Sequence, residues 1–237
     1  MISSDSQHAY RAARTLLVLL LLSGLLFALW DAINFDSDIS RIWGNHTGFV
    51  LKTHPVWGVT IYKAERLIGW AALALLTYLT VKPPKYLMAL HRMPKHRRFW
   101  MLAAVLLAVF LIQILKRTSL TSCPWDYQIF GGIAQDVSHW RFGVRDGGPG
   151  HCFPAGHPST GFAFLAVPAF LSLNSPRLSA WVVLIVLSYG ALLGLTQVVR
   201  GAHFVSHALW SAWWCGAVAC GCVWLALALE KRSLFSR

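Results

Sequence analysis

Three short polar segments of the chain contain residue types that can act on a phosphate group. The segments are Lys116–Asp126, Cys152–Thr160 and Thr196–His207. Imidazole changes its protonation near neutral pH, so His157 in the second segment and His203 in the third can serve as nucleophile or as general acid. Lys116 and Arg200 add fixed positive charge that suits an anion. Together these residue types suit a site that binds an anion such as phosphate.

The backbone beside these side chains also suits an anion. Ala155 and Gly156 come just before Pro158, and proline favours the start of a helix. Free N–H groups at a helix start point toward a bound phosphate, and glycine lets the backbone approach it closely. We therefore expect Ala155 and Gly156 to contact the phosphate, with Arg117 as a second basic residue beside Lys116.

The composition indicates that membrane helices position these segments. The chain has 237 residues, of which 56% are hydrophobic and 13% charged, and its mean hydropathy is +0.53. A soluble domain of this length cannot bury so much apolar surface. We predict an all-α bundle of six transmembrane helices, because six stretches approach the length that crosses a bilayer. They cover about residues 15–34, 65–81, 99–115, 158–174, 179–198 and 207–229, the fourth being short and interrupted by Pro168.

The basic residues predict the orientation of the bundle. The formal charge is +12, but the lysines and arginines fall in loops and tails between apolar stretches, where they set topology. Twelve of the 21 lie on the side that holds both termini, six of them within 82–98. We expect that side to be cytoplasmic and the three polar segments to lie at the periplasmic face of an inner membrane. A nucleic-acid partner is not expected.

Two of the five cysteines, Cys123 and Cys152, fall in one outward loop. An oxidising compartment permits a disulfide between them, and two free thiols remain the alternative. The sequence has no Cys-x-x-Cys or His-Glu-x-x-His spacing, so we predict neither a metal nor another cofactor.

The three segments resemble the motifs of the type 2 phosphatidic acid phosphatase (PAP2) superfamily, which read K-x6-R-P, P-S-G-H and S-R-x5-H-x3-D. Here Lys116 is followed after six residues by Cys123-Pro124, the second motif is Pro154–His157, and the third extends from Thr196 to His207. The resemblance covers about residues 65–229 of a chain that we treat as one membrane domain, 1–237. It implies that His203 attacks phosphorus to give a phosphohistidine and that His157 protonates the departing oxygen.

Four positions depart from the family motifs. Cys123 and Gln197 stand where the motifs have arginine, Ala155 where they have serine, and His207 where they have the aspartate that orients the nucleophile. A neutral His207 can accept a hydrogen bond from His203, but it cannot stabilise an imidazolium as a carboxylate does. Arg200 and Arg117 are candidates to replace the two arginines, and Asp126 or Asp136 to supply the negative charge.

A subgroup of the family is similar at these positions. Its C-P-W-D, F-P-A-G-H and R-G-A-H-F-x-S-H stretches resemble Cys123–Asp126, Phe153–His157 and Arg200–His207. The departures therefore look like a subgroup pattern.

The function expected from the resemblance is metal-independent hydrolysis of a lipid-linked phosphate or pyrophosphate. Phosphatidic acid, phosphatidylglycerol phosphate, a polyprenyl diphosphate and lipid A are all candidate substrates. A lipid-to-lipid phosphotransferase is one alternative. A non-catalytic phospholipid-binding or transport protein is another, because an aspartate and an arginine of the motifs are replaced. The expected partners are the lipid substrate and the membrane.

Overall fold

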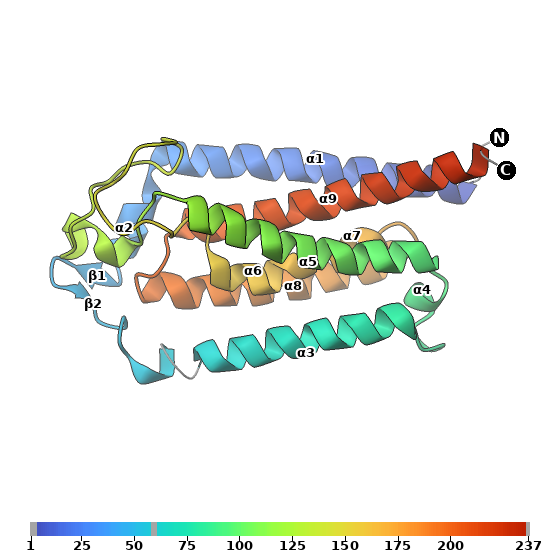
Figure 1. The fold of residues 1–237 in the computed structure, drawn as a ribbon, viewed down its shortest axis with the longest axis horizontal. Helices are drawn as coiled ribbons and strands as arrows, with labels where there is room; N and C mark the ends of the chain where they lie inside the picture. The colour runs from blue at the N-terminus through green and yellow to red at the C-terminus, as the bar shows by residue number, and fades with distance from the viewer. Residues whose placement is uncertain (1–3, 58–60, 236–237) are drawn as a thin grey trace.

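The computed structural model describes residues 4–57 and 61–235, which form a bundle of long helices with short connecting elements at its two ends (Figure 1). Within these residues, five helices are long and apolar enough to cross a membrane. The five are α1 (Ser4–Ile33), α3 (Ile61–Val81), α5 (Lys95–Thr118), α8 (Pro176–Val199) and α9 (Val205–Phe235). Five of the six predicted spans thus correspond to long helices.

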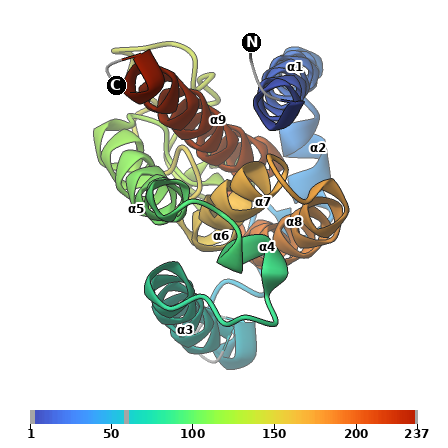
Figure 2. The ribbon, with the colours of Figure 1, turned by 90° about the vertical axis from the view of Figure 1, so that its right-hand side faces the viewer.

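The predicted fourth span is shorter than a full crossing. It consists of α6 (Gly156–Phe162), a 3-10 turn (Ala163–Leu165) and α7 (Ala166–Leu171). A helical rise of 1.5 Å per residue makes this segment roughly 24 Å long. It lies between α5, α8 and α9 in the middle of the bundle, as the end view shows (Figure 2). Its small buried residues Ala163 and Ala166 belong to the main apolar core.

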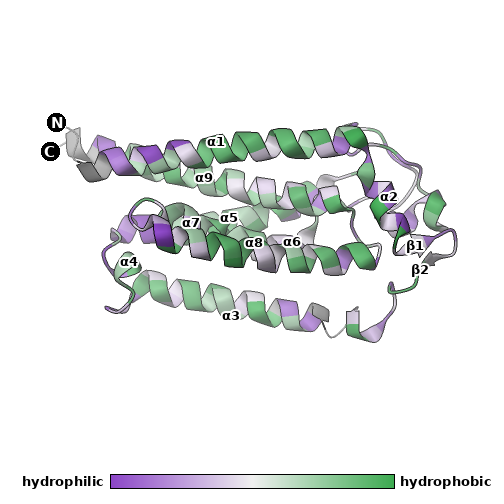
Figure 3. Ribbon diagram, turned by 180° about the vertical axis from the view of Figure 1, so that it is seen from behind, coloured by the Kyte–Doolittle hydropathy of each residue, from purple (hydrophilic) through white to green (hydrophobic). Residues whose placement is uncertain are grey.

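The long helices are apolar along their length and polar near their ends (Figure 3). Leucines such as Leu21, Leu22 and Leu25 of α1 expose more than half of their surface. Such broad apolar exposure is unfavourable in water and suits contact with lipid. The arrangement is therefore compatible with a membrane protein.

Both termini and the short helix α4 (Met88–His91) lie at one end of the bundle, whereas the remaining short elements lie at the other (Figure 1). Those elements are α2 (Phe35–Arg41), the antiparallel pair β1 (Gly44–Asn45) and β2 (Gly48–Phe49), and the 3-10 turns Pro124–Asp126 and Gln128–Phe130. Phe49, Tyr127, Phe130 and Phe204 form a second small core there. This core holds the loops that carry the polar segments.

α6 approaches α8 closely because Gly161 of α6 faces Gly190 of α8. A Cβ on Gly161 would lie 3.0 Å from Cα of Gly190, and a Cβ on Gly190 would lie 2.3 Å from the ring of Phe162. Only glycine at position 190 leaves room for that ring. A Cβ on Gly221 of α9, by contrast, would meet no atom of a neighbouring element within 4 Å in the described part of the chain.

We expect Gly190→Ala to destabilise the bundle by about 1–3 kcal/mol, because Phe162 must leave its place in the core. Thermal unfolding of detergent-purified protein measures this effect. Gly221→Ala is the matched control and should leave the midpoint unchanged or raise it slightly. Equal midpoints for the two variants would contradict the packing described for α8.

Candidate active site

His203 lies in the tight loop between α8 and α9. Gly201 has a φ of +74°, and a Cβ there would also lie 2.3 Å from the ring of Phe49. The backbone N–H groups of Ala202 and His203 donate to the carbonyl of Gln197, at 2.9 and 3.3 Å. The loop thereby turns the imidazole inward, and His203 is only 3% exposed.

The Nδ1 side of His203 faces other protein groups. Nδ1 lies 3.4 Å from Nδ1 of His207, in the first turn of α9, and 3.3 Å from Sγ of Cys152. The ring also hydrogen-bonds to the backbone of Cys152. These contacts orient the imidazole.

His157 and Lys116 come to the same place from two other elements. Lys116 lies in the last turn of α5, and its Nζ is 3.5 Å from the position that a Cβ on Gly156 would occupy. His157 follows at the start of α6 and is partly buried. Lys116 and His157 both lie close enough to His203 to act on it electrostatically, so the structure brings one basic residue and two histidines from the three polar segments together.

Burial and positive charge keep both histidines neutral. Burial lowers the pKa of His157 to about 4, with further lowering by the charges of Lys116 and Arg200. Burial also lowers the pKa of His203 well below its ordinary value, helped by Lys116 and His157. A neutral imidazole is the nucleophilic form, so His203 is ready to attack an electrophile at neutral pH.

A disulfide joins Cys123 to Cys152, with a Cα separation of 5.2 Å. It links the first polar segment to the second, and the N–H of Cys152 also donates to the carbonyl of Thr121 at 2.9 Å. Among the described residues, Cys123, Cys152 and His203 form the one cluster with the spacing of metal ligands, but its two sulfurs are bonded to each other. The disulfide therefore packs against the ring of His203.

Arg200 lies at the end of α8 within a polar network. Its Nη1 donates to Oε1 of Gln197 at 3.4 Å, and Nη2 donates to the carbonyl of Lys52 at 3.3 Å. Behind it, Thr196 donates to Glu65 of α3, a residue that is only 5% exposed. We did not predict Glu65 from the sequence, although an ionisable residue inside an apolar helix signals a function.

Two residues expected at the phosphate lie differently. The N–H of Ala155 donates to the carbonyl of His207 at 3.1 Å, so this amide connects the second and third polar segments. Arg117 is exposed at the end of α5. Asp126 was expected as a candidate counter-charge. Burial raises the pKa of its carboxyl group, and the charge of Lys52 lowers it.

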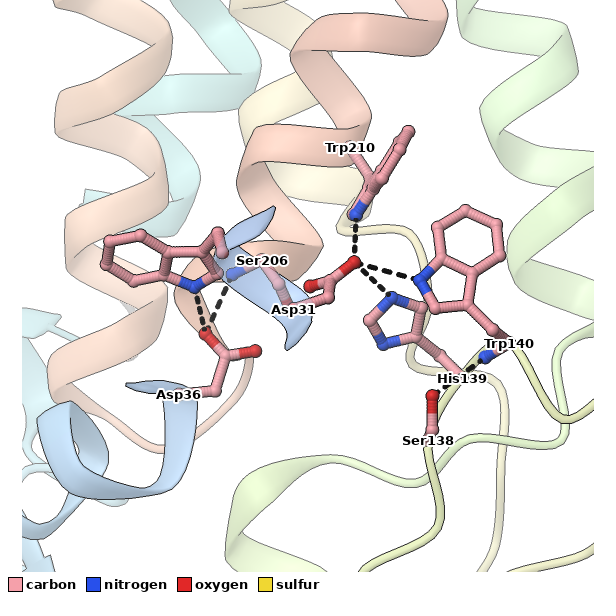
Figure 4. Close-up of polar contacts among 8 residues, drawn as sticks. Asp31, Asp36, Ser138, His139, Trp140, Ser206 and Trp210 are labelled. Carbon is pink, nitrogen blue, oxygen red and sulfur yellow. Dashed lines mark hydrogen bonds and ion pairs between the residues drawn. The ribbon is translucent and has the colours of Figure 1, made fainter. Parts of the chain in front are cut away.

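A cluster of polar side chains surrounds Asp31 (Figure 4). Oδ2 of Asp31, at the end of α1, accepts hydrogen bonds from Nε1 of Trp210 at 2.7 Å and Nε1 of Trp140 at 2.8 Å, and it lies 3.2 Å from Nε2 of His139. Asp36 of α2 accepts the backbone N–H of Ser206 at 3.0 Å, at the start of α9. Residues that precede the segment resembling the family thus contact the site.

This cluster borders a polar cavity of about 300 Å³. Its lining includes His207, His139 and the carboxylates of Asp31, Asp36 and Asp136. His207 is fully buried, and its Nε2 has no hydrogen-bond partner among the described residues. His207 thus lies between the cavity and His203, which it meets through Nδ1.

A family model of the PAP2 superfamily matches residues 98–231. Neither the curated proteins nor the solved structures give a match to the chain. The matched residues include all three polar segments and the imidazoles of His157, His203 and His207. The chain therefore belongs to the PAP2 superfamily, whose members are generally phosphatases.

Proposed function

We propose that the protein hydrolyses a lipid-linked phosphate or pyrophosphate through a phosphohistidine on His203. The observation that carries the proposal is the orientation of this buried imidazole, with Nδ1 held against His207 and Cys152 and a neighbouring positive charge on Lys116. Such an arrangement prepares Nε2 to attack phosphorus. The family supports a phosphatase in general, and the substrate class and mechanism are our inference.

In the first step, Nε2 of His203 attacks phosphorus while the bond from phosphorus to the lipid oxygen breaks. His157, which takes up a proton when the phosphate binds, donates that proton to the departing oxygen, so a lipid alcohol or a lipid monophosphate leaves. In the second step, neutral His157 removes a proton from water, and the resulting hydroxide oxygen displaces His203 to release inorganic phosphate. Lys116 and Arg200 stabilise the negative charge on the phosphoryl oxygens.

The site lies at the end of the bundle opposite the termini and the basic 82–98 segment (Figure 1). We place the termini in the cytoplasm and the site at the periplasmic face of the inner membrane, because basic residues concentrate on the cytoplasmic side. At the membrane face, the phosphate head group of a lipid can reach the histidines while its acyl chains stay in the bilayer. The disulfide suits an oxidising compartment.

We expect His203→Ala to reduce phosphate release by at least about 1,000-fold, since the attacking nitrogen is removed. The assay incubates detergent-purified protein with a panel of lipid phosphates and chelator and measures free phosphate. His54→Ala, an exposed histidine in the loop before α3, is the control and should match the parent. Equal turnover by His203→Ala and the parent would reject the mechanism and favour a non-catalytic role.

The same assay separates hydrolysis from phosphotransfer. Phosphate that appears on a second lipid and not in solution would assign a lipid-to-lipid transferase. Loss of parent activity on adding chelator would contradict metal-independent chemistry.

The lowered pKa of His157 predicts a pH dependence of oxyanion binding. With a pKa of about 4 in the empty site, His157 is neutral near pH 7, and a bound oxyanion raises this pKa because it favours the imidazolium. Binding therefore takes up a proton and tightens as the pH falls. We expect the affinity for tungstate, measured by calorimetry, to rise by up to about tenfold per pH unit between about pH 8 and 6.

In His157→Gln this pH dependence should largely disappear, because the residue that takes up the proton is gone. The same ligand is used with both proteins, so any change of the ligand with pH affects them equally and the difference between them reports on His157. An unchanged pH dependence in the variant would show that another group takes up the proton.

A further inference from the structure

The His203–His207 pair lacks a negative charge in direct contact. Phosphorylation of Nε2 while Nδ1 keeps its proton makes the His203 ring cationic, and both rings are buried. A buried charge without a counter-charge costs several kcal/mol. Nδ1 of His207 lies 3.4 Å from Nδ1 of His203, but a neutral imidazole does not balance the charge. The structure should therefore hold a carboxylate close behind His207.

Several carboxylates other than Asp31 lie near the cavity and are unsuited. Asp146 is buried, but it accepts hydrogen bonds from Ser122 and Gly148. Asp36 is committed to Nε1 of Trp30 and the N–H of Ser206, both at 3.0 Å. Asp126 interacts with Lys52, and Asp136 is exposed. Asp31 differs, because its side chain is only 11% exposed and its Oδ1 is buried without a hydrogen-bond partner among the described residues.

His139 contacts both Asp31 and His207, and Figure 4 shows its contact with Asp31. Its Nε2 is 3.2 Å from Oδ2 of Asp31, and its ring meets that of His207 edge to face, with centroids 5.9 Å apart. Phe153 stacks on the same ring at 4.1 Å and fixes its plane. His139 is thus held between the carboxylate and the pair.

The polar cavity joins these groups. Asp31, His139 and His207 all line it, and its volume of about 300 Å³ accommodates several water molecules. His207 Nε2 and Asp31 Oδ1 are both buried without a protein partner among the described residues. Water in a polar cavity commonly satisfies such atoms. A hydrogen-bonded path from Nε2 of His207 to Asp31 is therefore geometrically available.

We propose that Asp31 is a positioning residue that supplies negative charge to the His203–His207 pair across this cavity, and that it holds His139 in place beside His207. The proposal rests on the proposed function. Asp31 lies outside the region 98–231 that matches the family model, and His139 lies within that region, in its long loop. His203 donates from Nδ1 to His207, His207 donates from Nε2 to the cavity, and Asp31 holds His139 and balances the charge. No covalent bond changes along this path.

The test is a kinetic comparison of Asp31→Asn with Asp38→Asn in the parent and in His207→Asp. Asp38 is an exposed carboxylate of α2 that pairs with Arg41, and it provides the matched control. We expect Asp31→Asn to lower kcat about 10- to 100-fold with KM changed less than about twofold. Asp38→Asn should stay within about twofold of the parent.

His207→Asp places a carboxylate directly beside His203, so Asp31 becomes dispensable for the charge. In that background we expect Asp31→Asn to cost less than about threefold in kcat, a non-additivity that a purely structural role would not produce. The proposal is overturned if Asp31→Asn behaves like Asp38→Asn in the parent, or if it costs as much with Asp at position 207 as with His.

A second measurement does not depend on turnover. In protein labelled with ¹⁵N-histidine, the ring nitrogens of His139 and His207 should shift in Asp31→Asn and not in Asp38→Asn. Unchanged signals in both variants would overturn the proposal even if His207→Asp fails to fold. A parent that turns over no lipid phosphate would refute the proposed function, while the shifts would still decide whether Asp31 acts on His207.

Discussion

The site depends on how the imidazole of His203 is held between α9 and the disulfide-bonded loop. His207 and Cys152 contact Nδ1 from two directions, at 3.4 and 3.3 Å. The ring of His203 is almost fully buried, so its contacts with the protein hold it in one orientation. In the proposed mechanism Nδ1 is held by these contacts and Nε2 attacks phosphorus, so the mechanism depends on the geometry of the loop.

The remaining structure supports this contact. The close glycine contact of α6 with α8 brings His157 and Lys116 toward the ring, since α6 begins beside the end of α5. The small core of Phe49, Tyr127, Phe130 and Phe204 holds the loops, and Asp36 fixes the start of α9 through Ser206. Residues of α1, α2 and β2 thus complete a site whose histidines all lie in the family-matched region.

Much of this arrangement was predictable from the sequence. Apolar runs predicted the five long helices, because length and hydropathy are local properties. The motif order predicted that Lys116, His157 and His203 would meet. The fourth span was predicted as one helix over about 158–174, whereas the structure divides this segment into α6, the 3-10 turn Ala163–Leu165 and α7. The roles of Asp31 and Glu65 could not be read from spacing, because their contacts join residues more than 100 positions apart.

Direct detection of the phosphoenzyme tests the central claim most directly. Protein mixed with a lipid phosphate carrying ³²P and quenched within one turnover should hold label that is stable in alkali and lost in acid, as expected for phosphohistidine. Peptide mapping should place that label on His203. Label on another residue, or rapid phosphate release with no labelled protein at any quench time, would contradict attack by the imidazole held in this loop.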